Sequence, residues 1–205
     1  MSIKFKTGFD TDMIKILIKD RTLDIEELES SLLYDLENDN TYLDNLYDYA
    51  DKCNPSFREK IDEVASKSNN LNAIRYITLN NLEPKKVFDI FVSSIGNVMI
   101  DDQDVIDIVN DFKKSMITKG LFDDSVEAIK HSNDREAIIT SALIFDNSLI
   151  KEFFGSKEDL YLYLISDPSE NDNLYIEFLL SMNNNELEKS AKSRVKNIDN
   201  KINNY

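Results

Sequence analysis

The densest group of side chains that could do chemistry is a run of five aspartates. It consists of Asp101, Asp102, Asp104, Asp107 and Asp111. The last three are three and four residues apart, so they share one face of a helix, and carboxylate oxygens are ligands for Mg²⁺ or Ca²⁺. A carboxylate enzyme with a divalent metal is therefore one alternative for this chain. The glycine and the terminal glutamate of a calcium-binding loop are missing, however, and we interpret the group as a solvated acidic face.

Other catalytic chemistry lacks the residues that it needs. His131 is the only histidine and Cys53 the only cysteine, so a four-ligand zinc site cannot be assembled from them. His131 ends a predicted helix, where a cation suits the helix dipole, and we interpret it as a capping residue. The four glycines are too far apart for a phosphate-binding loop or a dinucleotide fingerprint. We predict no enzyme, no bound metal and no cofactor.

Tyrosines among acids suggest a different kind of site. Between Asp20 and Glu63 there are 14 acidic and 4 basic residues. Tyrosine is favoured at the centre of protein interfaces because it combines apolar area with a hydroxyl. The predicted partner-binding residues are Tyr34, Asp35, Asp39, Tyr42, Asp44, Asp48 and Tyr49. The alternative is that Tyr47 is a core residue and that the other tyrosines of this stretch are half-buried at the edges of the core.

The net charge of −15 bounds the class of partner. Direct binding to nucleic acid needs a basic surface, and anionic membranes repel an acidic protein. We therefore predict a protein–protein interaction module, such as an adaptor, an assembly chaperone or an inhibitor, that binds a basic surface of a partner protein. A DNA mimic, whose carboxylates imitate phosphates and block a nucleic-acid-binding protein, is a second alternative.

The apolar residues predict an all-α fold of about twelve short helices. They recur every three or four residues nearly everywhere, as in Val105, Ile108, Val109 and Phe112. Four glycines and three prolines are too few for the tight turns of a β protein. No apolar run reaches the roughly 18 residues of a membrane helix. With a single cysteine, the chain suits a reducing compartment, and we predict a cytoplasmic protein.

Abundant asparagine and a single glutamine, Gln103, suggest an AT-rich genome. A phage or virus is the predicted source, and the host cytoplasm would then be the location.

Polar clusters divide the chain at intervals of about 32 residues. They begin at Asn38, Asn69, Asp101, Asn133 and Asn171. Each is expected to open a helix that a second helix follows, as in stacked helix pairs. This period resembles that of ankyrin, TPR and HEAT-like repeats, although their signature residues are absent. Both a solenoid-like stack and an irregular bundle stay open for the single predicted domain, residues 1–184.

Residues 185–205 predict a separate amphipathic helix with a basic character. From Leu187 to Tyr205 there are five basic and two acidic residues. An apolar stripe runs along the segment through Leu187, Ala191, Val195, Ile198 and Ile202. The helix is expected either to pack back on the domain or to bind a partner, including a second copy of the chain in a homo-oligomer.

Overall fold

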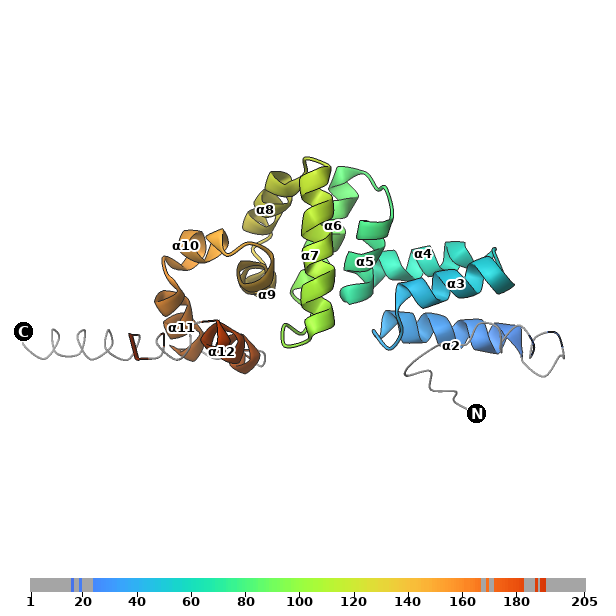
Figure 1. Ribbon diagram of the computed structural model, residues 1–205, viewed down its shortest axis with the longest axis horizontal. Coiled ribbons are helices and arrows are strands. Elements are labelled where there is room, and N and C mark those ends of the chain that lie inside the picture. Colours follow the sequence, from blue (N-terminus) through green and yellow to red (C-terminus); the bar gives the residue numbers. More distant parts are fainter. Residues whose placement is uncertain are drawn as a thin grey trace, which may run out of the picture. The chain divides into compact units, whose positions relative to one another are not determined.

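The computed structural model describes residues 24–166 and 172–182 together with six single residues, and these residues confirm the predicted all-α class (Figure 1). The single residues are Ile16, Lys19, Ser169, Leu187, Lys189 and Ser190. About a dozen short helices follow one another, and no strand occurs within this part of the chain. The longest helix has 16 residues. No helix of the described part is long and apolar enough to span a bilayer.

The chain divides into two compact units, Met1–Asn97 and Val98–Tyr205, called unit 1 and unit 2 here. Unit 1 contains α2 (Ile25–Glu37), α3 (Leu43–Cys53), α4 (Phe57–Lys67), α5 (Leu71–Leu79) and α6 (Pro84–Ile95). Unit 2 contains α7 (Gln103–Thr118), α8 (Phe122–His131), α9 (Arg135–Thr140), η1 (Ser141–Phe145), α10 (Ser148–Phe154), α11 (Lys157–Ser166) and α12 (Asp172–Ser181). The predicted single domain, residues 1–184, would span both units.

Three of the five predicted polar clusters mark helix starts, because one side chain of each caps the first turn. The cluster at Asn38 does not, since α3 begins after Tyr42 without a side-chain cap. Asn70, Asp102 and Asp134 stand 32 residues apart and are the N-cap residues of α5, α7 and α9. Each side chain accepts a hydrogen bond from a backbone N–H of the first turn, which has no partner inside the helix. A second helix follows in each case, as the spacing of the clusters predicts.

In unit 1 helices that are close in sequence pack against one another. α4 lies against both α2 and α3, α5 against α4, and α6 against α5 (Figure 1). The core between α2, α3 and α4 is built from leucines such as Leu32 and Leu46 and from an edge-to-face pair of rings, Tyr49 and Phe57, whose centroids are 5.6 Å apart. This order of contacts is that of a stack of helices.

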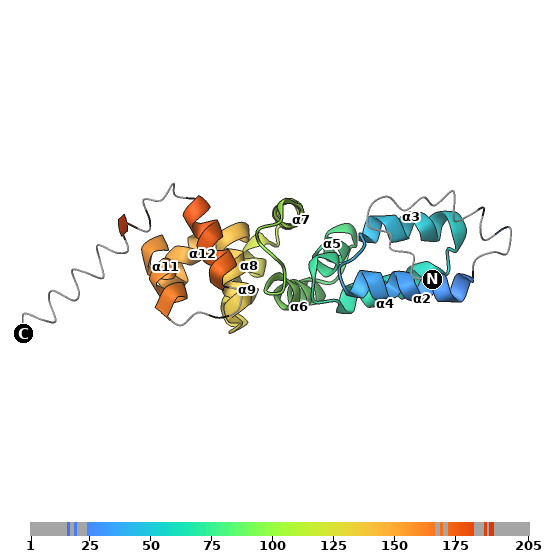
Figure 2. The same ribbon diagram turned by 90° about the horizontal axis from the view of Figure 1, so that it is seen from below.

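Unit 2 is arranged around a buried centre instead. All five residues of η1, a π-helical turn that continues α9, are buried. This turn contacts α7, α9, α10 and α12, and α11 lies beside α12 (Figure 2). The Nζ atom of Lys113 on α7 donates to the carbonyl oxygen of Phe145 over 2.7 Å, which satisfies an acceptor at the end of the turn. Unit 2 is therefore a bundle around a short apolar segment.

The predicted C-terminal helix, residues 185–205, lies almost entirely outside the described residues. Only Leu187, Lys189 and Ser190 belong to the described part, and all three are helical. The helix as a whole, and the oligomer through it, stay predictions.

Candidate functional site

The outer face of α2 combines acidic side chains with an exposed tyrosine. The helix begins after Asp24, whose carboxylate accepts hydrogen bonds from the N–H groups of Glu26 and Glu27. Leucines at intervals of four residues turn one side toward the core. The opposite side carries Tyr34, whose exposed fraction is 63%. Tyr34 is the most exposed large apolar side chain of the described residues, and it shares this helix with several acids, so this face is the leading candidate surface.

The acids of this face have no basic partner among the described residues. Glu26, Glu27, Asp35 and Glu37 form no ion pair with any described residue. The helix contains no lysine or arginine. Within the described part of the chain no base therefore neutralises these four acids, and their negative charge is available to attract a basic partner.

The acids of α3 are used differently. Asp44 pairs with Arg75 of α5, and Asp48 pairs with Lys52 one turn later, with an Oδ1–Nζ distance of 2.8 Å. Asp51 lies 3.3 Å from a guanidinium nitrogen of Arg58. Each of these carboxylates has a base of the same unit beside it. Two of the predicted partner-binding residues, Asp44 and Asp48, thus form intramolecular ion pairs.

Asp39 belongs to the turn between α2 and α3 and is held by a buried amide. Its φ angle is 57°, a left-handed conformation that aspartate tolerates better than most residues. The Nδ2 atom of Asn72 donates to Oδ1 of Asp39 and to the carbonyl oxygen of Thr41, both over 2.9 Å. The Oδ1 atom of Asn72 accepts from the N–H of Leu43 over 3.2 Å. Asp39 therefore has a structural role that the sequence did not indicate.

The tyrosines of this stretch divide between surface and core. Tyr42, the residue before the first turn of α3, is exposed, as binding to a partner requires. Tyr49 has an exposed fraction of 0%, and its hydroxyl lies 3.4 Å from Glu29, which is itself buried. Burial raises the pKa of Tyr49, and the charge of Glu29 raises it further. The prediction that Tyr49 binds a partner is therefore wrong, because α3 turns this side chain into the core.

Tyr47 is a buried residue, as the alternative interpretation expected. Its hydroxyl donates to Asp62 over 2.6 Å, and the guanidinium of Arg58 lies 4.0 Å from the ring centroid. Burial raises the pKa of Tyr47, and the hydrogen bond to Asp62 adds to the shift.

The structure brings together Tyr34 and Asp35 of the predicted set on α2 and adds Glu26, Glu27 and Glu37. Sequence reasoning missed these three because it weighted the aspartates around the tyrosines. A signal was present, since no lysine or arginine occurs between Arg21 and Lys52. The surface formed by Glu26, Glu27, Tyr34, Asp35 and Glu37 is called the α2 face below.

The five aspartates around α7 do not converge. Asp102 caps the helix through the N–H of Asp104, Asp107 accepts from Gln103, and Asp111 pairs with Lys114. Within the described residues no group of three or more histidine, cysteine, aspartate or glutamate side chains is placed to hold a metal ion. The metal-dependent alternative therefore has no candidate centre in this part of the chain.

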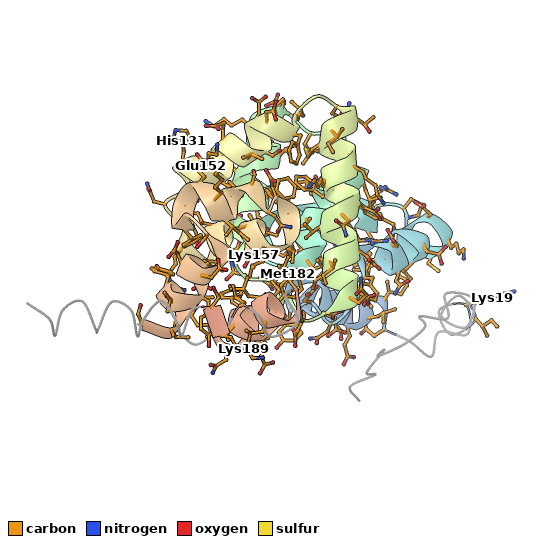
Figure 3. The ribbon with its side chains drawn as sticks, turned by 60° about the vertical axis from the view of Figure 1, so that its left-hand side comes forward. Lys19, His131, Glu152, Lys157, Met182 and Lys189 are labelled. Carbon is orange, nitrogen blue, oxygen red and sulfur yellow. The ribbon has the colours of Figure 1, made fainter. Side chains whose placement is uncertain are left out.

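His131 is the last residue of α8, and its exposed side chain is labelled in Figure 3. Its Nδ1 atom lies 2.8 Å from the carbonyl oxygen of Glu127, one turn earlier. The neighbouring Lys130 holds Glu127 and Glu152 at 2.8 and 2.9 Å. These contacts belong to the end of a helix, where basic side chains favour the helix dipole.

Among the described residues of unit 2, Asp172 and Arg135 form an ion pair whose carboxylate is buried. Asp172, at the start of α12, is fully buried and accepts from both terminal nitrogens of Arg135 over 3.0 and 2.8 Å. The N–H of Ser169 donates to the same carboxylate over 2.8 Å. Burial alone would raise the pKa of Asp172, but the hydrogen bonds from Arg135 and Ser169 outweigh it and hold the pKa below its usual value.

Other side chains occupy the remaining positions around this pair. Arg135 also donates to the hydroxyl of Tyr163 over 3.1 Å and to Glu136 over 2.6 Å. Tyr175 donates in turn to Glu136 and accepts from Thr140. These mutual hydrogen bonds form a network that fastens α12 to α9.

No protein-family model, no curated protein and no solved structure matches the chain. A function must therefore be argued from the chain's own residues.

Proposed function

We propose that this chain is a non-enzymatic protein–protein interaction module that binds a basic surface of a partner protein through the α2 face. The observation that carries the proposal is Tyr34, exposed to 63% in the middle of acids that form no ion pair with a described residue. An adaptor, an assembly chaperone and an inhibitor all fit this description. Their common requirement is a partner with exposed arginine and lysine.

The two components of the α2 face would act at different stages of binding. Acidic side chains attract a basic partner over a distance of about 10 Å at ordinary ionic strength, which speeds association. Tyr34 would then supply most of the contact energy, because its ring is large and loses little conformational freedom on binding. Arginine suits this combination best, since its guanidinium pairs with carboxylates and stacks on tyrosine rings.

The ion pairs of α3 support the choice of α2. A carboxylate that already holds a base must exchange one partner for another, so it gains little from a second base. Asp44 and Asp48 are in that situation. The unpaired acids of α2 would gain the whole interaction.

The test is a comparison of three variants of the full chain in affinity capture from an extract of the native host. The first is Tyr34→Ala, the second is Glu27→Lys with Asp35→Lys, and the third is the control Glu59→Lys with Asp107→Lys. The control makes the same change in net charge at exposed acids outside the α2 face. A basic protein that the wild type and the control retain, and that the first two variants lose, would support the proposal.

Retention of every captured protein by all three variants would refute it. The DNA-mimic form is distinguished by adding double-stranded DNA. If the partner is a nucleic-acid-binding protein that DNA displaces, the inhibitor form is the correct one.

A further inference from the structure

The last two helices of unit 2 are apolar on every side. Residues Leu160–Ile165 form an unbroken apolar run in α11, and in α12 only Glu177 interrupts the run from Leu174 to Leu180. A helix that is hydrophobic all round is normally covered all round. In α11, however, Ile165 has an exposed fraction of 45% and Leu162 is half-buried.

The two flanks of α12 also carry apolar side chains that are incompletely covered. Tyr175 and Leu179 are buried against the unit. Leu174 and Phe178 on one flank of these two residues, and Ile176 and Leu180 on the other, are only half-buried. The described helices therefore leave apolar area of α11 and α12 exposed, where a stack or bundle would ordinarily end in a polar face.

This region is also strongly acidic. Residues 158–186 contain seven acidic residues and no lysine or arginine. Glu177, which lies opposite the buried side of α12, is exposed. A segment that covered the apolar area would be favoured if it carried basic residues beside an apolar stripe.

The chain itself continues with such a segment five residues after α12 ends. Its stripe repeats at steps of four, four, three and four residues from Leu187 to Ile202, and Arg194 and Lys201 border the stripe. Leu187, the first residue of the stripe, has an exposed fraction of 3%, whereas Lys189 and Ser190 are exposed. Figure 3 labels Met182 at the end of α12 and Lys189. The remainder, residues 191–205, lies outside the described residues.

We infer that residues 187–205 of the same chain form a basic amphipathic helix that covers the exposed apolar side of α11 and α12. Consecutive helices joined by a short connection usually pack against each other, and residues 182–186 provide a connection of ordinary length. The stripe would bury Ile165 and the half-buried residues on one flank of α12, and its basic neighbours would face the acids of 158–186. This contact is independent of the proposed function, which concerns unit 1.

Hydrogen exchange of the full chain, followed by mass spectrometry, tests the inference. The disruptive variant is Val195→Asp with Ile198→Asp, which places two charges on the stripe. Its matched control is Ser193→Asp with Asn200→Asp, which adds the same charges on the opposite side of the predicted helix. We expect amides of 191–205 and of α11 to exchange on the order of tenfold faster in the disruptive variant than in the wild type and the control.

A second pair of variants tests the surface that receives the segment. Ile165→Asp should release residues 191–205 to the same degree as the disruptive variant. Ile117→Asp, at an isoleucine of α7 with an exposed fraction of 56%, should leave their exchange unchanged.

Three outcomes would overturn the inference. The first is a wild type in which residues 191–205 exchange as fast as an unfolded chain. The second is equal exchange in the disruptive variant and its control. The third is protection that disappears on dilution while light scattering changes from twice the chain mass to one chain mass, because a second copy would then cover the surface.

Discussion

Each unit has a loop between two helices that a buried polar side chain holds in place. The side chain is neutral in unit 1 and charged in unit 2. Unit 1 holds the turn between α2 and α3 with a neutral amide, Asn72, whose side chain has bonds to Asp39, Thr41 and Leu43. Unit 2 holds the start of α12 with a buried ion pair between Arg135 and Asp172. Removal of a neutral anchor costs hydrogen bonds, whereas removal of Asp172 also takes the buried carboxylate away from Arg135 and leaves it with Glu136 as its partner. Because of this difference, we expect substitution of the anchoring residue, and a change of pH, to alter the free energy of unfolding of the two units by unequal amounts.

The largest effect is expected from Asp172→Ala. The substitution removes the carboxylate that Arg135 and the N–H of Ser169 share, and it should destabilise unit 2 by about 3 kcal/mol. We place it at the low end for a buried pair because Arg135 is partly exposed. Urea unfolding followed by far-UV circular dichroism measures the change.

The control for this prediction is Asp111→Ala, which breaks an exposed ion pair with Lys114. It should cost less than about 1 kcal/mol. If Asp172→Ala and Asp111→Ala lowered the free energy of unfolding by the same amount, burial of Asp172 would have no energetic consequence.

A smaller effect is expected from Asn72→Ala in unit 1. The N–H of Leu43 and the carbonyl oxygen of Thr41 lose a buried partner, and the predicted cost is about 2 kcal/mol. Asn97→Ala provides the comparison, because this exposed asparagine bonds only the carbonyl oxygen of Ser93 one turn earlier and should change stability by less than about 0.5 kcal/mol. A cost for Asn72→Ala as large as that for Asp172→Ala would remove the distinction between the two anchors.

The pH dependence should separate the units further. The pKa of Asp172 in the folded chain lies below its ordinary value of 3.8. The unfolded chain therefore takes up this proton first, and the stability from Asp172 is complete above the unfolded pKa and is lost as the pH falls through the folded pKa. The difference in stability between the wild type and Asp172→Asn should narrow as the pH is lowered from about 6 to about 3.

The side chain of Asn97 in unit 1 donates to a backbone carbonyl oxygen, which does not titrate, so the difference between the wild type and Asn97→Ala should stay constant over the same range. Urea titrations at several pH values measure both differences. If the difference in free energy of unfolding between the wild type and Asp172→Asn did not change with pH, the lowered pKa of Asp172 would be contradicted.

The smallest effect is expected outside both anchors, at Tyr34. Its side chain is largely exposed, so Tyr34→Ala should change the free energy of unfolding by less than about 0.5 kcal/mol. Thermal unfolding with far-UV detection is sufficient to check this. A large loss would mean that Tyr34 stabilises unit 1, and its use as a binding variant would then need Tyr34→Phe instead.

Much of the fold could be predicted from local patterns. The recurrence of apolar residues at three and four positions indicates helices because this period matches one turn. The N-cap residues Asn70, Asp102 and Asp134 are recognisable because a capping side chain must immediately precede the first turn. The π-helical turn from Ser141 to Phe145 could not be predicted, since its bonds between residues five apart depend on burial among four other helices.

The candidate site could be predicted only in part. Composition located the acidic stretch, and Tyr34 and Tyr42 are exposed as a binding role requires. The prediction for Tyr49 was wrong because α3 turns this side chain into the core, where it meets Glu29 of α2 and Phe57 of α4. Asp44 lies 31 residues from its partner Arg75. Sequence spacing within a helix cannot reveal a pair of that kind.

The sequence by itself determined the helical class, the strong negative charge and the stretch from Arg21 to Lys52 that lacks a base. These follow from local periodicity and from residue counts, which do not depend on how the chain packs. Tertiary structure decided which acids remain unpaired, which tyrosine reaches solvent, and that Arg135 meets Asp172 across 37 residues. Burial and ion pairing join residues that are distant in the chain, and only the packing of helices brings such residues into contact.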